Sequence, residues 1–146
     1  MGPTKRGKGT KLMAVADRAS TPVACYAMVA SPAECTLVAK TLRHTFTREK
    51  PALLLGDKTY DSDPLDEELR AKGIRLISPR KHNRVKPKTQ DGRELRRYCR
   101  RWTIERLFAW LQYFRHLVIR YDYHLRVFEA FVMLGMMVVL LRRLWN

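Results

Sequence analysis

The sequence has few cysteines, and they show no pairing pattern. Cys25, Cys35 and Cys99 form no Cys-x-x-Cys pair and have no His-x-x-His partner at ligand spacing. An odd number of irregularly spaced cysteines argues against a disulfide framework and against a structural zinc site. We therefore expect three reduced thiols, as in a cytosolic protein.

The sequence also lacks an apolar run long enough to cross a bilayer. The longest run, residues 131–141, is well short of the ~20 residues that a membrane-spanning helix needs, and Arg142 and Arg143 follow it. The N-terminus is basic and has no apolar core, unlike a secretory signal peptide. We expect a buried terminal helix and no membrane association.

Acidic residues are scarce relative to basic ones. Lys and Arg number 29 against 14 Asp and Glu, which gives a formal net charge of +15 and an isoelectric point near 10.3. Such an excess of positive charge favours a polyanionic partner, most often nucleic acid and less often an anionic membrane surface. Charge alone does not distinguish these partners.

The length of 146 residues, without an internal repeat or a linker, predicts one domain over residues 1–146. Residues 1–10 form a basic lead-in that we expect to be unstructured or to lie along a nucleic-acid channel. Residues 79–92 are rich in basic residues and have no apolar periodicity. They predict a flexible basic loop that contacts phosphate.

The first half of the sequence predicts strands and short helices. Residues 11–16 and 23–30 are apolar segments separated by a turn, which is typical of an antiparallel hairpin. Ser-Pro-Ala-Glu at residues 31–34 predicts a helix start with Ser31 as its cap.

A second group of elements follows. A strand at residues 52–55, a helix at 63–71 that stops at Gly73 and a strand at 74–78 predict a parallel crossover, so we expect one mixed α/β sheet. Two longer helices, at residues 93–120 and 127–144, complete the chain.

The predicted helix at residues 93–120 carries an isolated acid, Glu105, among many arginines. Apolar residues recur at helical spacing and define a core-facing side of this helix: Ile104, Leu107, Phe108, Leu111 and Phe114. Glu105 lies at the edge of that side, and helical geometry places Tyr98 and Arg101 near it. A carboxylate in so basic a segment predicts a specific role.

Two of the predicted strands end in an aspartate, Asp17 and Asp57. Side chains at strand ends can converge at one edge of a sheet, where a helix can add Glu105. Three clustered carboxylates repel one another unless cations neutralise them, and Mg²⁺ prefers such oxygen ligands. Two ions about 3.5–4 Å apart support phosphodiester chemistry, so the acids predict a metal-dependent nuclease.

Each acid also has a simpler interpretation. Asp17 could serve the hairpin turn, and Asp57 could be an ordinary loop residue. Glu105 could pair with Arg101 one helical turn away, a surface interaction of about 0.3–0.5 kcal/mol. The residue patterns by themselves leave both interpretations open.

Four segments resemble the DDE transposases of bacterial insertion sequences, in the group with a ribonuclease-H-like catalytic domain. They are RGKGTKLMAVAD, ASPAECTLV, GDKTYDSDPL and RRYCRRWTIERLFAWLQYFRHLVIRY, and the resemblance covers nearly the whole chain. The last two segments are specific motifs. The resemblance implies a ribonuclease-H-like mixed sheet, with an antiparallel hairpin and parallel strands packed against helices.

The resemblance also implies a site. The family pattern of two strand aspartates and a helix glutamate matches Asp17, Asp57 and Glu105, which would be the catalytic residues and the ligands of two Mg²⁺ ions, with Mn²⁺ able to substitute. The family signature Tyr-x2-Arg-x3-Glu matches Tyr98, Arg101 and Glu105. Tyr98 and Arg101 would then lie beside the scissile phosphate.

One position departs from the family pattern. The signature often closes with a lysine seven residues after the glutamate, and this sequence has Gln112 there. Arg115 is the candidate to take over that phosphate contact. The full set of residues expected to contact DNA is Tyr98, Arg101, Lys81, Arg84, Lys86, Lys88, Arg97, Arg100 and Arg115.

The function implied by the resemblance is strand cleavage at insertion-sequence ends and transfer of the freed 3′ ends into target DNA. The expected partners are double-stranded DNA and an N-terminal DNA-binding part, either separate or joined by frameshifting, with a dimer on the DNA. A cytoplasmic, nucleoid-associated location would follow. The alternative is a non-enzymatic basic DNA-binding remnant of a truncated transposase.

Overall fold

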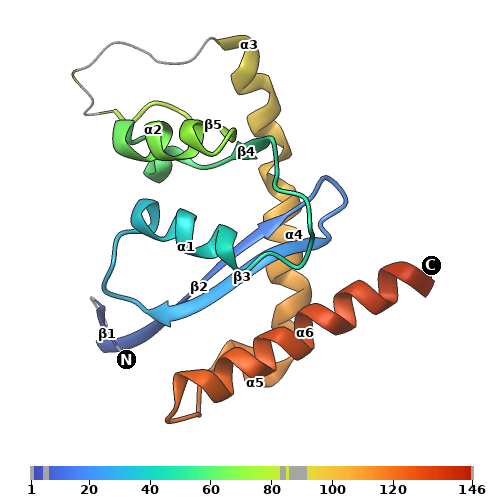
Figure 1. Cartoon of the computed structure of the whole chain (residues 1–146). Helices are drawn as coiled ribbons and strands as arrows, with labels where there is room; N and C mark the ends of the chain where they lie inside the picture. The colour runs from blue at the N-terminus through green and yellow to red at the C-terminus, as the bar shows by residue number, and fades with distance from the viewer. Residues whose placement is uncertain (1, 5–6, 83–84, 86–91, 146) are drawn as a thin grey trace.

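The chain forms two small sheets with helices around them, in a computed structural model that describes residues 2–4, 7–82, 85 and 92–145 (Figure 1). The strands are β1 (Gly2–Thr4), β2 (Gly7–Ala16), β3 (Pro22–Val29), β4 (Leu53–Leu55) and β5 (Arg75–Ile77). The helices, with short 3-10 helices labelled η, are η1 (Glu34–Leu37), α1 (Val38–Arg43), η2 (Lys58–Tyr60), α2 (Asp63–Ala71), α3 (Gly92–Leu95), η3 (Arg96–Arg101), α4 (Trp102–Gln112), α5 (Arg115–Val118) and α6 (Leu125–Trp145). The mixed α/β class predicted from the sequence is confirmed.

β2 and β3 form the predicted antiparallel hairpin. Thr10 lies opposite Val29, and Ala14 lies opposite Cys25. β1 runs along the other edge of β2, where it pairs with Gly7–Gly9. The expectation of an unstructured lead-in is therefore wrong for β1 and the start of β2, because pairing in a sheet satisfies the backbone donors and acceptors of this segment.

β4 and β5 form the predicted parallel pair, connected by α2. Among the described residues, however, no strand joins this pair to the hairpin, so the expected single mixed sheet is present as two sheets. Within the described residues, β2 has a strand partner on only one edge from Thr10 to Ala16, and β4 pairs with a strand on only one edge. The cavity described below lies between their other edges.

The helix predicted at residues 63–71 is confirmed as α2, and it has a proline in its first turn. Gly73 follows it with a φ of +73°, a left-handed conformation that favours glycine. A methyl group at this position would meet no atom within 4 Å, so conformation alone requires the glycine.

We expect Gly73→Ala to lower the free energy of unfolding by about 1–2 kcal/mol, because alanine is strained at positive φ. Gly92→Ala is the matched control. Gly92 also has open space around its Cα, but no positive φ, and it begins a helix. Urea denaturation of both variants should show a loss for the first and no loss, or a gain of up to about 1 kcal/mol, for the second. Equal changes in the free energy of unfolding for the two variants would contradict the conclusion that the positive φ requires glycine at Gly73.

The start of the first helix differs from the prediction. η1 begins at Glu34, with Ala33 rather than Ser31 at its N-cap and no side-chain cap hydrogen bond. Lys11 Nζ donates to the Pro32 carbonyl over 2.9 Å and lies 3.7 Å from Glu34 Oε1. These contacts from β2 hold the segment before η1.

The helix predicted at residues 93–120 ends earlier than expected. α3, η3 and α4 follow one another to Gln112, but Phe114 is extended (φ −87°, ψ 98°) and the chain turns into the short α5. A Cβ at Gly135 of α6 would lie 3.0 Å from Leu117 and 3.2 Å from Leu111. Packing of these apolar side chains against α6 favours the turn over a longer helix.

Two apolar clusters hold the elements together. The first joins β3, α4 and α6 through Cys25, Ala27, Leu107, Leu111, Phe128, Val132, Met136 and Val139, and the second joins α1, α2 and β5 through Val38, Leu65, Leu69, Ile74 and Leu76. Side chains alternate across β3, so its other face is directed toward α1. There Tyr26 stacks on His44, with ring centroids 4.8 Å apart.

The C-terminal helix is confirmed as α6, within two residues of its predicted bounds. Within the described ranges, none of the helices combines the length and the apolar character needed to cross a membrane. Cys25 on β3 is buried against α6, where its Sγ lies 3.7 Å from Met133 Sδ. Burial, followed by the charge of Glu129, raises the pKa of the Cys25 thiol to about 11, which keeps it protonated at neutral pH.

Candidate functional site

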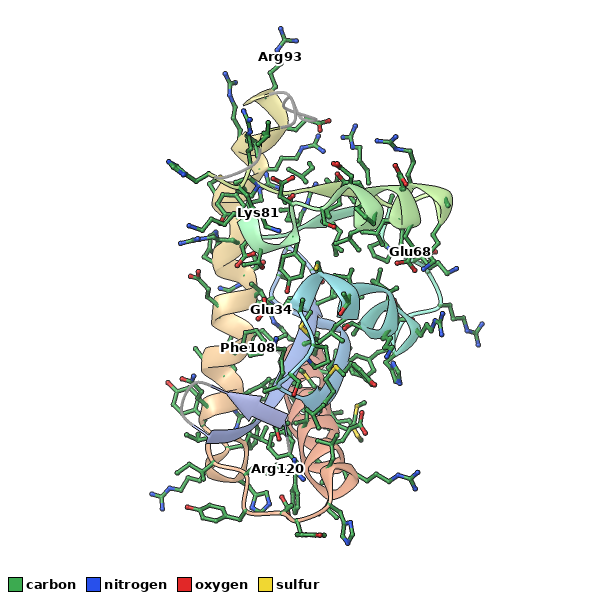
Figure 2. The ribbon with its side chains drawn as sticks, turned by 90° about the vertical axis from the view of Figure 1, so that its left-hand side faces the viewer. Glu34, Glu68, Lys81, Arg93, Phe108 and Arg120 are labelled. Atoms are coloured by element: carbon green, nitrogen blue, oxygen red, sulfur yellow. The ribbon has the colours of Figure 1, made fainter. Side chains whose placement is uncertain are left out.

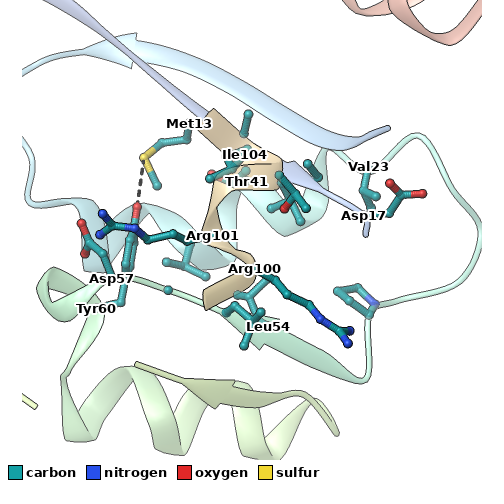
Figure 3. A pocket seen from close by; sticks show the side chains of 18 of the residues that line it. Met13, Asp17, Val23, Thr41, Leu54, Asp57, Tyr60, Arg100, Arg101 and Ile104 are labelled. Carbon is teal, nitrogen blue, oxygen red and sulfur yellow. Dashed lines mark hydrogen bonds between the residues drawn. The ribbon is translucent and has the colours of Figure 1, made fainter. Parts of the chain in front are cut away.

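A cavity of about 670 Å³ lies between the hairpin, β4 and the η3–α4 segment (Figure 3). All three predicted carboxylates, Asp17, Asp57 and Glu105, are among the residues that line it, and so are Tyr98 and Arg101. These residues come from parts of the chain that are far apart in sequence. The fold therefore brings these five predicted site residues to one cavity.

Asp17 lies in the turn that follows β2. Its Oδ1 accepts the backbone N–H groups of Ala19 (2.8 Å) and Thr21 (2.7 Å), and the turn includes Ser20 at a φ of +64°. Asp17 thus stabilises the hairpin turn, as the simpler interpretation proposed. Figure 3 shows Asp17 at one end of the cavity and Asp57 at the other.

Asp57 directly follows β4 and caps η2. Its Oδ1 accepts the backbone N–H of Thr59 over 2.7 Å and also accepts the Thr59 hydroxyl. The side chain is exposed at the end of the strand. Capping fixes the carboxylate at this end of the cavity, where a ligand in solution can reach it.

Tyr98, Arg101 and Glu105 form a continuous series of contacts along η3 and α4. Arg101 Nη1 donates to the Tyr98 hydroxyl over 3.0 Å, and Arg101 Nε lies 3.4 Å from Glu105 Oε1. The pKa of Arg101 is raised, first by its hydrogen bond and electrostatic interaction with Tyr98, then by the charge of Glu105 and, to a smaller extent, by that of Asp57. Arg101 therefore lies in the field of both carboxylates, and Figure 3 shows it directed toward Asp57.

The three predicted acids do not meet at one point. Glu105 pairs with Arg101, which is directed toward Asp57, whereas Asp17 lies at the far end of the cavity and is engaged by the turn. Across residues 2–4, 7–82, 85 and 92–145, no three His, Cys, Asp or Glu side chains are placed to hold one metal ion. Asp57 and Glu105 have the oxygen chemistry that Mg²⁺ prefers, but the described residues supply two such groups at this end of the cavity and not three.

Tyr60 closes the Asp57 end of the cavity. It packs on Gly56, where a Cβ would lie 2.9 Å from Tyr60 Cδ2, so this position requires the small residue. The Tyr60 hydroxyl lies 4.0 Å from Met13 Sδ. Burial raises the pKa of Tyr60, and Glu34 and Asp57 raise it further, so the hydroxyl stays protonated at neutral pH.

Arg106 is a residue that the sequence did not single out. Its Nε donates to Ser20 Oγ over 2.9 Å and its Nη2 donates to the Ala19 carbonyl over 3.2 Å, which ties the hairpin turn to α4. Its guanidinium lies 4.5 Å from the ring of Trp102 and 5.2 Å from that of Trp110. Trp102 and Trp110 lie four residues before and four residues after Arg106, a spacing that places all three on the same side of a helix. This spacing was the signal in the sequence that could have identified Arg106.

The basic loop is anchored at its start. Asp61 is buried and its Oδ2 accepts the backbone N–H of Lys81 over 2.8 Å. Residues 79–82 and 85 are in neither helix nor strand, as predicted for a loop. The other predicted DNA-contacting residues of this segment lie outside the described residues: Arg84, Lys86 and Lys88.

The remaining predicted DNA-contacting arginines divide into two groups. Arg97 and Arg100 are exposed and line the cavity next to Arg101. Arg115 is exposed on α5, beyond the turn that ends α4, and is not one of the cavity-lining residues. Figure 2 shows Arg93 projecting at one end of the molecule, whereas Arg120, toward the other end, is half-buried and donates to Thr10 Oγ1 and to the carbonyls of Asp122 and Tyr123.

The fold and the site define a basic α/β domain with carboxylates and arginines around one cavity. A family model described as "Transposase DDE domain" matches residues 2–141, so the chain belongs to this family, as the sequence motifs predicted. A Burkholderia cepacia protein named as a transposase for insertion sequence element IS402 is 34% identical over 87 residues, which cover 60% of this chain and 37% of that protein. The chain thus matches little more than a third of that relative's length. No solved structure matches the chain.

Proposed function

We propose that this chain is the catalytic part of a transposase that cuts DNA strands at the ends of an insertion sequence and joins the freed ends to target DNA. The observation that supports this most directly is the Tyr98–Arg101–Glu105 contact series beside Asp57, in a chain of the transposase DDE domain family. At this end of the cavity, Arg101 can bind phosphate beside the carboxylates of Glu105 and Asp57.

Asp57 and Glu105 are the proposed ligands of the divalent cations, two Mg²⁺ ions or Mn²⁺ in their place. Such cations neutralise the carboxylates and activate an attacking oxygen when they are bound. Asp17 completes the triad predicted from the sequence, but its Oδ1 is engaged in the turn. Its role is therefore proposed separately and is tested by its own variant in the Discussion.

When DNA is bound, a phosphate would be a second acceptor for the Arg101 guanidinium, besides Glu105. In the structure its guanidinium contacts Glu105 and Tyr98, and the side chain is exposed. A phosphate beside the carboxylates would offer the guanidinium a bidentate contact, for which arginine is geometrically suited. Tyr98 would then hold Arg101 in position from the other side.

A cleavage assay tests the proposed function. The substrate is a duplex that carries the ends of the insertion sequence encoding this chain. We expect strand cleavage with Mg²⁺ or Mn²⁺ and none with excess EDTA, and we expect Mn²⁺ to bind the protein in an electron paramagnetic resonance titration. DNA binding without cleavage in any of these conditions would favour the non-enzymatic remnant instead.

DNA binding should depend strongly on salt, and the cavity arginines should account for part of that dependence. We expect Arg97→Ala and Arg100→Ala each to lower the slope of log K against log salt by about 0.9, the value for one lost phosphate contact. Lys72→Ala is the charge-matched control, because Lys72 pairs with Glu68 on α2 and does not line the cavity. Fluorescence anisotropy at several salt concentrations gives the slopes. Equal slopes for all three variants would contradict a DNA-binding role for the cavity arginines.

A dimer on DNA and an additional DNA-binding part remain elements of this proposal. Both are part of the proposal because the resemblance to DDE transposases implies them.

A further inference from the structure

The connection between α5 and α6 is held in place by Arg120. Arg120 Nη1 donates to Thr10 Oγ1 of β2 over 2.7 Å. Its Nε donates to the Asp122 carbonyl over 2.9 Å, and its Nη2 donates to the Tyr123 carbonyl over 2.7 Å. One guanidinium therefore fixes the backbone of the connection and attaches it to the hairpin, at the end of the molecule opposite α2 and β5 (Figure 1).

This fixed connection presents two tyrosine rings to solvent. Tyr121 is 75% exposed and Tyr123 is 89% exposed. The residue between them, Asp122, is directed inward: its side chain is 15% exposed, and its Oδ2 lies 2.9 Å from His116 Nε2. The backbone contacts of Arg120 thus hold both rings outward and leave the carboxylate in an internal contact.

The exposed charge around these tyrosines is positive. Arg115 of α5 and Arg126 of α6 are both exposed, and Asp122 is the only acid between them in the sequence. The two helices lie close together, since the ring centroids of His116 and Phe131 are 4.0 Å apart. Arg115, predicted from the sequence to contact DNA, is therefore part of a surface that we call the tyrosine patch, defined by Arg115, Tyr121, Tyr123 and Arg126.

The tyrosine patch has the chemistry that binds nucleic acid with unpaired bases. Aromatic rings stack on the faces of bases, and guanidinium groups bind phosphates in bidentate fashion. In a paired duplex the faces of the bases are covered by the neighbouring base pairs, so the rings would gain little from it. Rings that are held in place before binding also lose little conformational freedom when a base stacks on them.

We propose that the tyrosine patch binds unpaired bases of DNA, as a second contact surface beyond the cavity. Glu105 and Gln112 are separated by about 10 Å along α4, at ~1.5 Å per residue, and the patch lies beyond Gln112. A strand with ~3.4 Å between phosphates would cover that distance in roughly three nucleotides. The inference rests on the proposed function for the identity of the ligand as DNA, but it does not require cleavage.

Fluorescence anisotropy with two DNA probes tests the proposal. The probes are a labelled single strand and a labelled blunt duplex of the same length, about 20 nucleotides, which exceeds the usual site size of about 4–16 nucleotides. EDTA is present, so that binding is measured without metal-dependent cleavage. We expect the Tyr121→Ala/Tyr123→Ala double variant to bind the single strand about tenfold or more weakly, and the duplex less than about twofold more weakly.

Two further variants separate base stacking from other effects. Tyr121→Phe/Tyr123→Phe keeps both rings and should bind the single strand as tightly as the unmodified chain does. Trp145→Ala removes an exposed ring at the far end of α6, where Trp145 is 88% exposed, and it should leave binding of both probes unchanged. The circular dichroism spectra of all variants should match that of the unmodified chain, because the substituted rings lie in solvent.

The outcomes distinguish this proposal from the proposed function. If the double alanine variant binds the single strand as tightly as the unmodified chain, and both bind the duplex, only the tyrosine patch is wrong. Equal losses for the single strand and the duplex would contradict a role for unpaired bases. A chain that binds neither probe would contradict both proposals. Unchanged DNA binding with a changed oligomeric state in sedimentation would show that the patch is a contact between copies of the chain.

Discussion

Asp57→Asn and Glu105→Gln are each expected to reduce strand cleavage at least about 100-fold. Loss of a group that only positions a metal ligand already costs about 10–100-fold, so loss of a ligand should cost more. Both substitutions keep the shape of the side chain and remove its charge. An asparagine amide oxygen can still accept the Thr59 N–H that Asp57 accepts at 2.7 Å, so folding should be preserved. Initial cleavage rates with Mg²⁺ and with Mn²⁺ provide the measurement.

The control for these variants is Glu68→Gln. Glu68 is an exposed acid on α2 that pairs with Lys72 and does not line the cavity, so its substitution should leave cleavage unchanged. The circular dichroism spectra of all variants should match that of the unmodified chain. If Asp57→Asn or Glu105→Gln cleaves as fast as Glu68→Gln, the proposed site is wrong.

Asp17→Asn separates the two roles considered for Asp17. Asparagine can accept the same turn hydrogen bonds from Ala19 and Thr21, but it is a poor ligand for Mg²⁺. Because the structure assigns Asp17 to the turn, we expect this variant to retain cleavage within a few-fold. A loss as large as that of Asp57→Asn would restore the triad predicted from the sequence and would require the turn to rearrange before catalysis.

Leu107→Ala is expected to lower the free energy of unfolding by about 2–5 kcal/mol, the usual cost of such a truncation in a core. Leu107 is fully buried between β3 and α6, in the cluster that attaches α4 to the rest of the molecule. A small domain has a total stability of about 5–15 kcal/mol, so this loss would be large. Urea denaturation measures it.

Leu134→Ala is the matched control for Leu107→Ala. Leu134 is the same residue type on α6, but 54% of its surface is exposed, so its truncation should cost about 0.5 kcal/mol or less. Because α4 carries Glu105 two residues before Leu107, we also expect Leu107→Ala to lower cleavage at temperatures where the fold is intact. If the two variants are equally stable, the first apolar cluster is not the core of the domain.

The sequence predicted most of the local structure. The hairpin, the β4–α2–β5 unit and the C-terminal helix all follow from apolar periodicity and from turn residues such as Gly73, because these signals act over a few residues. The motif around Glu105 was also local, since Tyr98, Arg101 and Glu105 lie within two helical turns. Their hydrogen bond and ion pair have the spacing that the sequence indicated.

Features that depend on long-range packing did not follow from the sequence. The predicted helix at residues 93–120 ends at Gln112, because Leu111 and Leu117 pack against Gly135, which is far away in the chain. The cap predicted at Ser31 was wrong, because contacts from Lys11 hold the segment before η1. In both cases a tertiary contact outweighs a local preference of about 1 kcal/mol or less per residue.

The sequence by itself determined the family, the basic charge, the types of element and the candidate acids. Only the tertiary structure decided where the acids lie: Glu105 pairs with Arg101, which is directed toward Asp57, while the hairpin turn engages Asp17 at the other end of the cavity. Only the tertiary structure showed the open edges of β2 and β4. The physical reason is that periodicity fixes the face on which a side chain lies, whereas the separation of two strands depends on what packs between them.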